Sequence, residues 1–310
     1  ASFVVPPPQP LGRYEGARAT WNAQSFIPGD GSMLGFGPAL ARFPEQLAIL
    51  GDGAIDVTQY GPGALVPAFD IPDAVRNGVI QAGWTVGVFL TQRSKAFGLL
   101  GGAPFGPDPA SFVAWLKQGG GQGQIDDLFD HHVGAKALVC AMVGTAGDLW
   151  STRPLRSLSD LAGLKVRTMG FAADTLSSLG ASPVLLPGSE LIPALERGVI
   201  EAANWVGPAA DLEVGLPNYA NHYYMSGILE PATPILFLVN WDAWTALEPV
   251  GQDFVTAVCE ENLHHSLAEY ERLNAAALQT IRAGGTTVAP LPNEIGLALR
   301  RAWYDIADGL

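Results

Sequence analysis

The amino-acid sequence predicts an α/β protein built as two lobes that share one cleft. Two observations carry this prediction: short apolar strands alternate with helices along the chain, and one helix–strand unit occurs twice. Residues 67–87 match residues 187–207 at a constant offset of 120 positions, with eight identities among 21 positions. The identical pairs are Pro67/Pro187, Ala74/Ala194, Gly78/Gly198, Val79/Val199, Ile80/Ile200, Ala82/Ala202, Val86/Val206 and Gly87/Gly207.

Both copies of this repeat predict the same local structure. A short helix begins with an acidic residue in its first turn, Asp70 or Glu190, where the helix dipole favours negative charge. The helix ends at Gly78 or Gly198, because glycine accepts the left-handed conformation that follows many helices. An apolar Val-Ile-x-Ala strand comes next. Helix–glycine–strand units are common in α/β proteins, but the identities at one offset favour two similar lobes.

The remaining segments continue the α/β alternation. Strands are expected at 18–28, 51–61, 136–144, 164–170, 182–188 and 235–240, and helices at 34–50, 108–121, 124–132, 171–181, 251–285 and 294–309. The strand at 235–240 is expected to return to the first lobe, and the long helix to span or brace both lobes. The expected parts are lobe I (18–143 and 231–252), lobe II (144–230 and about 284–310), the long helix (253–283) and an extended N-terminal arm (1–17).

Composition excludes several classes of protein. The chain has 310 residues and a net charge of −13, so it lacks the cationic surface that nucleic-acid binding needs. It contains no apolar tract long enough for a transmembrane helix. The sequence opens without a basic n-region or a long apolar h-region, as expected after removal of a signal peptide or for a cytosolic protein cut for expression. Cys140 and Cys259 each lie in an apolar run and are expected to be buried free thiols.

Candidate ligand-binding residues lie at strand ends, where open α/β sheets bind their ligands. Arg167 follows one strand of the second lobe, Asn204 and Trp205 end another, and Trp84 ends the matching strand of the first lobe. A guanidinium can hold a carboxylate by two parallel hydrogen bonds, although Arg167 could instead be a surface residue paired with an acid. Asn204 would offer a neutral donor and acceptor, or else be a turn residue that ends the strand.

Aromatic residues are the other candidates for the wall of the cleft. Trp84, Trp150 and Trp205 could line a flat apolar pocket, as aromatic residues often do in binding sites. Core packing is the alternative for all three, and it is favoured for Trp150. Phe26, which follows a strand, and Phe171, which opens a helix, are weaker candidates.

No catalytic motif is present. The chain lacks a nucleophile elbow, a P-loop, a dinucleotide-binding fingerprint and an HExxH motif. The pairs His131-His132 and His264-His265 are adjacent in sequence and so do not share a helix face. The sequence therefore favours a binding protein over an enzyme.

Three segments in the second half resemble a known family. "SLSDLAGLKVRTMG" (157–170), "LGASPVLLPGSELIPALERGVIEAANWVGP" (179–208) and "YANHYYMSGILEP" (219–231) resemble the periplasmic solute-binding subunits of tripartite ATP-independent periplasmic (TRAP) transporters. The resemblance points to the subgroup that binds 2-oxo acids and related carboxylates. It continues upstream, in the same order, in "WNAQSFIP", "GALVPAFDIPDAVRNGVI" and "GGAPFGPDPASFVAWLKQGGG".

The resemblance implies a fold, a ligand class and a partner. The fold is a two-lobed periplasmic-binding-protein clamp, type II-like, with lobe-crossing strands and a long bracing helix. The clamp closes on a small organic acid, a 2-oxo acid or other monocarboxylate, and delivers it to a membrane permease from the periplasm. Arg167 matches the family's signature arginine, which pairs with the substrate carboxylate. Some relatives swap their C-terminal helices, so a homodimer through these helices and a monomer both stay open.

Other ligands and roles also stay open. The same clamp could act as a carboxylate sensor, or bind an aromatic acid or a non-acid solute such as a sugar. Arg167 argues against a sugar, because a buried guanidinium without a partner is costly.

The sequence departs from this subgroup at three places. The subgroup has a glutamate, which helps to hold a cation that bridges to the substrate, where this chain has Asn204. It also tends to supply a glutamine from a loop that here reads "VGTAGDLW", although Asp148 in that loop could substitute. A hard cation takes several oxygen ligands, so no cofactor and no bridging sodium or calcium ion is expected. Ile228 and Leu229 replace an aromatic residue and a histidine, which predicts a more apolar wall.

Overall fold

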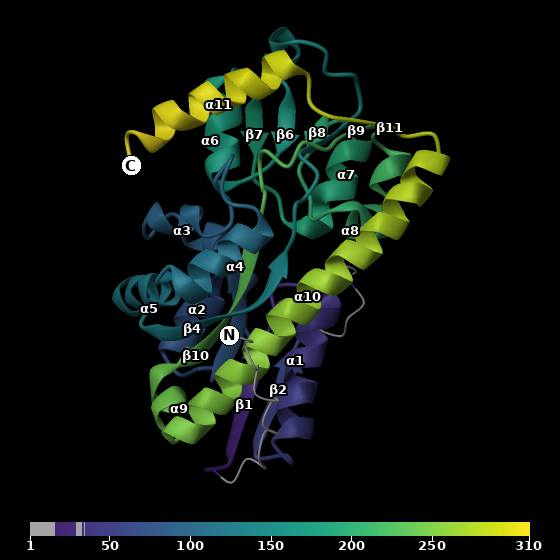
Figure 1. Ribbon diagram of the computed structural model, residues 1–310. Helices are drawn as coiled ribbons and strands as arrows, with labels where there is room; N and C mark the ends of the chain where they lie inside the picture. The colour runs from purple at the N-terminus through teal and green to yellow at the C-terminus, as the bar shows by residue number, and fades with distance from the viewer. Residues whose placement is uncertain (1–15, 29–32, 34) are drawn as a thin grey trace, which may run out of the picture.

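Two mixed β-sheets, each covered by helices, lie one above the other and are connected by a long diagonal helix (Figure 1). The computed structural model describes residues 16–28, 33 and 35–310. Almost all of the expected N-terminal arm (1–17) therefore lies outside the described residues. The two-lobed α/β architecture predicted from the sequence is confirmed. The lobe boundaries given above stay a prediction.

The first sheet has the strand order β2-β1-β3-β10-β4. Strand β1 runs parallel to β2 and β3, whereas β10 lies antiparallel between β3 and β4. The expected return of the strand at 235–240 to this sheet is thus confirmed. The strands are β1 (Ala19–Gln24), β2 (Ile55–Tyr60), β3 (Ala82–Val86), β4 (Ala135–Val143) and β10 (Thr233–Asn240). The helices around them are α1 (Gly37–Leu50), α2 (Ile71–Arg76), α3 (Ala96–Leu99), α4 (Pro109–Gln118), α5 (Gly121–His132) and α9 (Trp241–Thr245), with 3₁₀ turns η1 (Ala68–Asp70) and η2 (Gly87–Leu90).

The second sheet has the order β11-β9-β5-β8-β6-β7 and is built from shorter strands. They are β5 (Leu149–Ser151), β6 (Lys165–Arg167), β7 (Ser182–Val184), β8 (Ala202–Ala203), β9 (His222–Tyr224) and β11 (Thr287–Ala289). Its helices are α6 (Gly170–Ser178), α7 (Leu191–Glu196), α8 (Pro208–Glu213) and α11 (Asn293–Ala307), with 3₁₀ turns η3 (Leu158–Leu161), η4 (Gly188–Glu190) and η5 (Leu216–Asn218). Each sheet has its own apolar core.

The sequence repeat is a structural repeat. Elements η1, α2 and β3 in the first lobe correspond to η4, α7 and β8 in the second. Gly78 and Gly198 have φ angles of +69° and +67°, the left-handed geometry predicted for both. Asp70 and Glu190 both occupy N-cap positions, but neither side chain makes a capping hydrogen bond. Asp70 and Glu190 therefore do not cap these helices through their side chains. Their negative charge still interacts favourably with the helix dipole.

Helix α10 (Pro249–Ala283) packs on both lobes, as expected from its length. Val255 and Val258 near its start belong to the core of the first lobe, and Ile281 near its end belongs to a core cluster of the second. In between, the Tyr270 hydroxyl donates to the Val206 carbonyl over 2.8 Å. Despite this length, no helix in the described ranges is apolar enough to span a bilayer.

The expectation of two free thiols is wrong. Cys140 on β4 and Cys259 on α10 form a disulfide bond, with their Cα atoms 4.5 Å apart. These residues are 119 positions apart in sequence, and only the packing of α10 across β4 brings them together. Each cysteine is buried as predicted.

Two further connections cross between the sheets. One leads from β4 to β5, and the other leads from β9 back to β10. They lie against each other, because Ala146 N donates to Glu230 O over 3.3 Å and Thr145 Oγ1 donates to Pro231 O over 3.2 Å. The two crossing segments, 144–148 and 225–232, therefore form one junction between the lobes.

Candidate ligand-binding cleft

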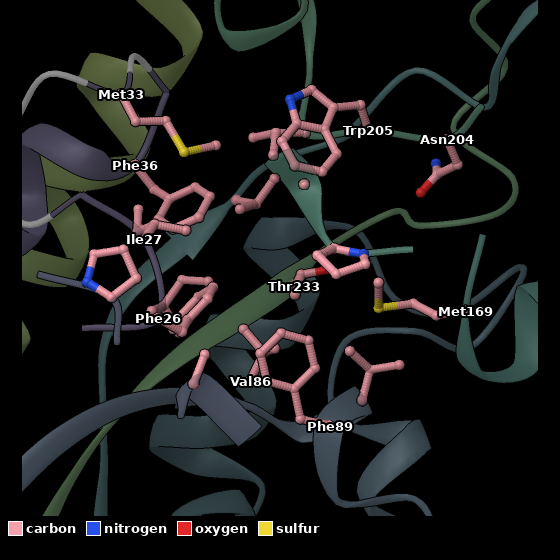
Figure 2. Close-up of a pocket in the computed structure, with 18 of the residues that line it drawn as sticks. Phe26, Ile27, Met33, Phe36, Val86, Phe89, Met169, Asn204, Trp205 and Thr233 are labelled. Atoms are coloured by element: carbon pink, nitrogen blue, oxygen red, sulfur yellow. The ribbon is translucent and has the colours of Figure 1, made fainter. Parts of the chain in front are cut away.

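A cavity of about 660 Å³ lies between the two sheets, with walls from both lobes (Figure 2). The first lobe contributes residues that follow its strands, and the second lobe contributes β6, the loop after β7 and the segment after β8. This position agrees with the rule that ligands bind at the carboxyl ends of strands. The lining residues used below are Phe26, Phe36, Phe69, Phe89, Arg167, Met169, Asn204, Trp205, Glu230 and Thr233.

Arg167 is the last residue of β6 and is only 6% exposed. Its Nη1 donates to the Asn204 carbonyl over 2.9 Å, and its Nε lies 3.5 Å from the Leu186 carbonyl. The guanidinium carbon lies 4.8 Å from the centre of the Trp205 ring, in cation–π geometry. Pairing of β6 with β8 sets these contacts, because it places Arg167 opposite Ala203, just before Asn204. The guanidinium is therefore held in place by its neighbours.

The Arg167 side chain is a buried cation that contacts no counterion in the described part of the chain. Burial lowers the pKa of Arg167 to about 10, against the opposing effect of the Glu230 charge, so the group stays protonated at neutral pH. No carboxylate oxygen among the described residues lies within 4.0 Å of its nitrogens, and Nη2 has no hydrogen-bond acceptor among them. Arg167 is thus not the surface residue, paired with an acid, that the sequence left open.

Glu230 is a charged wall residue that sequence reasoning missed. It is half-buried in the crossing segment between β9 and β10. Burial raises the pKa of Glu230 to about 7, Arg167 opposes this shift, and Asp148 adds to it. An acidic residue between Leu229 and Pro231, just before a buried strand, was the signal available in the sequence.

Asn204 fastens the second lobe to the crossing segment. Its Nδ2 donates to the carbonyls of Gly147 and Asp148 over 3.1 and 3.2 Å. Figure 2 shows its amide group turned toward the middle of the pocket. Asn204 therefore has a structural role and also presents its amide oxygen to the cavity.

Four phenylalanines form an aromatic wall on the first-lobe side of the cavity. Phe26 lies 6.1 Å from Phe36 and 5.4 Å from Phe89, and Phe69 lies 4.8 Å from Phe89, measured between ring centres. Only Phe26 was predicted. The other three occupy connections at the same end of the sheet and carry no motif that marks them in sequence.

Three predicted wall residues do not line the cavity. Trp84 packs in the first-lobe core beside Phe43 and Phe237, and its Nε1 donates to Gln59 over 2.8 Å. The sequence placed Trp84 at the end of its strand, but β3 continues to Val86, and Trp84 in the middle of the strand faces the core.

Trp150 and Phe171 are also buried elsewhere. Trp150 stacks on Tyr223 with ring centres 4.1 Å apart, and its Nε1 donates to Asp211 over 2.7 Å. Phe171 packs on Trp303 of α11, with ring centres 5.1 Å apart. Ile228 and Leu229 belong to the second-lobe core, so they do not make the wall more apolar as expected. The aromatic wall of the first lobe has that effect instead.

The two-lobed fold and the buried arginine in the cleft define a solute-binding clamp. Comparison with known proteins agrees: the family model for bacterial extracellular solute-binding protein, family 7 (DctP), matches residues 36–307. The chain belongs to this family, whose members are solute-binding receptors for transport and not enzymes.

Individual relatives cover most of the chain. A monocarboxylate 2-oxoacid-binding periplasmic protein of Nostoc sp. is 35% identical over 263 residues, which are 84% of this chain and 72% of that protein. A TRAP transporter solute-binding protein from Bordetella bronchiseptica, solved with copurified calcium and picolinate, has a TM-score of 0.89 and 30% identity, covering 94% of this chain and 86% of its own. A Pseudoalteromonas atlantica protein with bound sodium and pyruvate has a TM-score of 0.88 and 26% identity, covering 94% and 88%.

The cations in those structures raise the question of a cation site in this chain. The described residues contain no group of three or more His, Cys, Asp or Glu side chains that could hold a metal. Asp148, the substitute ligand suggested by the sequence, accepts hydrogen bonds from the backbone N–H groups of Ser226, Ile228 and Leu229. The other described lining side chains with oxygen atoms are those of Ser189, Asn204, Glu213, Glu230 and Thr233, and the charge of Arg167 acts on Glu230 and opposes binding of a cation beside it. These residues do not fit a site that needs several oxygen ligands.

Proposed function

We propose that this protein is a periplasmic receptor that binds a small monocarboxylate, a 2-oxo acid or a related acid, and delivers it to a TRAP permease. The observation that carries the proposal is the buried, positioned guanidinium of Arg167, which has no carboxylate in contact among the residues that the structure describes. The ligand of the Nostoc relative supports the choice of acid. The buried disulfide fits an oxidising compartment such as the periplasm.

In the proposed complex, Arg167 binds the ligand carboxylate through parallel, charge-assisted hydrogen bonds. The Asn204 carbonyl and the Trp205 ring orient the guanidinium, so little side-chain entropy is lost on binding. Glu230, when protonated, donates a hydrogen bond to a carboxylate or 2-oxo oxygen of the ligand, and the Asn204 amide oxygen accepts one from a hydroxyl group. We propose that no bridging cation takes part, because the donor set does not fit one.

The test is calorimetric titration of refolded, ligand-stripped protein with 2-oxo acids, hydroxy acids and sugars, each with calcium, with sodium and with a chelator. Arg167→Ala should weaken binding of the acids by about 100-fold, since two charge-assisted hydrogen bonds are lost. Arg167→Lys should recover only part of this loss, because an ammonium cannot form the two parallel bonds.

Arg272→Ala is the matched control. Arg272 lies on the surface of α10, where its side chain is 65% exposed and pairs with Glu269. This variant should bind the acids as the wild type does. Binding of sugars but of no acid would contradict the proposed ligand class, and binding that requires calcium or sodium would contradict cation independence.

A further inference from the structure

The polar groups of the cavity are concentrated on one side, whereas apolar groups line both sides. Its charged lining residues, Arg167, Glu213 and Glu230, come from the second lobe and the crossing segment. The polar residues Ser189 and Asn204 lie on the same side, and Thr233 lies at the start of β10. Every described lining residue between positions 26 and 101 has an apolar side chain or none: Phe26, Ile27, Pro28, Met33, Phe36, Pro62, Ala68, Phe69, Val86, Val88, Phe89 and Gly101.

This uneven distribution of polar groups limits the chemistry of the ligand. A ligand whose carboxylate is bound by Arg167 directs its other end toward the first lobe. Among the described lining residues there, only Thr233 has a side chain with a hydrogen-bonding group, and its hydroxyl already donates to the Gly101 carbonyl over 2.8 Å. A second carboxylate or a row of hydroxyl groups would be desolvated there with too few partners, which is costly. The described wall therefore selects against dicarboxylates and sugar acids.

The aromatic wall also has apolar surface left uncovered. Phe69 is 50% exposed, and its only ring contact among the described residues is with Phe89. Met33 and Met169 lie on opposite sides of the pocket and offer flexible thioethers that adapt to different ligand shapes (Figure 2). A cavity of about 660 Å³ is in the range that holds drug-sized ligands. A three-carbon acid such as pyruvate would leave most of this apolar surface in contact with water. Closure of the lobes would change the volume of the cavity but not the residues of its aromatic wall.

We infer that the ligand is a monocarboxylate with an apolar side chain, branched aliphatic or aromatic, which packs against Phe26, Phe36, Phe69 and Phe89. This inference rests on the proposed function, because Arg167 must hold the carboxylate for the side chain to reach this wall. It narrows the ligand from small organic acids in general to 2-oxo acids and related acids that are polar at one end only.

The experiment compares three 2-oxo acids on the ligand-stripped protein by calorimetric titration: pyruvate, 4-methyl-2-oxopentanoate and phenylpyruvate. Burial of each additional CH₂ group should tighten binding about fourfold, so both larger acids should bind at least tenfold more tightly than pyruvate. Phe69→Ala should weaken phenylpyruvate binding about fivefold and pyruvate binding less than twofold.

Phe69 is a suitable position because its exposed ring contributes little to the core, so the variant should fold. Tyr304→Ala is the matched control: Tyr304 is a 56% exposed aromatic residue on α11 outside the cavity, and its removal should change neither affinity. If pyruvate binds as tightly as the larger acids, or if Phe69→Ala affects all three equally or none, the inference is overturned while the proposed function stands. If no acid binds, the proposed function itself fails.

Discussion

At the scale of single residues, the arrangement of Arg167 and Glu230 shows how the cavity can accept an anion. Burial shifts the pKa of both groups toward the neutral form, down to about 10 for Arg167 and up to about 7 for Glu230. Desolvation is the largest cause in both, so mutual attraction does not offset the loss of water. Near neutral pH, the arginine stays charged while the glutamate is partly protonated. Glu230 then only partly neutralises the charge of Arg167, which stays available for a carboxylate.

This arrangement predicts a pH dependence of ligand binding. Glu230 is protonated below its pKa of about 7, and its negative charge above that pH repels an anionic ligand beside Arg167. Carboxylate affinity should therefore fall as pH rises from 6 to 8, by up to about tenfold per pH unit once Glu230 is ionised. Glu230→Gln should make affinity nearly independent of pH over this range. Calorimetric titration at pH 6, 7 and 8 measures both profiles.

Stability gives a ligand-free control for the same assignment. The pKa of Glu230 is raised from 4.5 in a solvated chain to about 7 in the folded protein. Its contribution to stability is therefore fully present below pH 4.5 and is lost as pH rises to about 7. Glu230→Gln should remove this loss, raising the urea midpoint relative to wild type at pH 8 but not at pH 4.

In the calorimetric titration, a wild-type protein whose affinity for the acid increases as pH rises would contradict the role given to Glu230.

The same scale shows what residue patterns can and cannot predict. Arg167, Asn204, Trp205 and Phe26 were chosen because they follow strands, and all four line the cavity. Trp84 was expected to end its strand but is the central residue of β3, where its side chain packs in the core. Phe36, Phe69 and Phe89 lie in loops and 3₁₀ turns whose paths depend on tertiary packing.

At the scale of secondary-structure elements, the longest and most periodic segments were predictable. The repeated helix–strand unit, the return strand β10 and the long helix α10 follow from identities and apolar patterns. Strands β5, β9 and β11 were missed: a strand of three residues is too short to show an alternating pattern, and the equally short β6 and β7 were predicted only as parts of longer segments. The disulfide was missed because it depends on how α10 crosses β4, and no local pattern in sequence shows that crossing.

The disulfide should contribute to the stability of the first lobe. It closes a loop between residues 119 positions apart, and removing such a bond typically costs about 2–4 kcal/mol. A Cys140→Ala/Cys259→Ala double variant should therefore unfold at lower urea concentration than the oxidised wild type. Reduced wild type is the control, and it should resemble the double variant.

Ligand binding by the double variant should stay close to that of the wild type in the absence of denaturant. Neither cysteine lines the cavity, and both side chains lie in the core of the first lobe. Unchanged unfolding after removal of both sulfur atoms would show that packing of α10 on β4 alone holds this part of the lobe.

At the scale of the whole molecule, the two sides of the cavity belong to different lobes. Arg167, the group proposed to bind the carboxylate, is on the second sheet, and the aromatic wall is on the first. Two crossing segments and helix α10 connect these lobes (Figure 1). A ligand that reaches both walls makes more contacts when the lobes are close together, so it should shift the population toward a closed form.

Small-angle X-ray scattering can measure this closure as a decrease in the radius of gyration. At saturating concentration, phenylpyruvate should lower the radius of gyration of the wild type more than pyruvate does, because only the larger acid reaches both Arg167 and the aromatic wall. Phe69→Ala should reduce the difference between the two acids, and Tyr304→Ala should leave it unchanged. If both acids at saturation give the same radius as the ligand-free protein, binding does not close the lobes. If pyruvate alone gives the full decrease, then Arg167 and its neighbours are sufficient for closure and the aromatic wall is not needed.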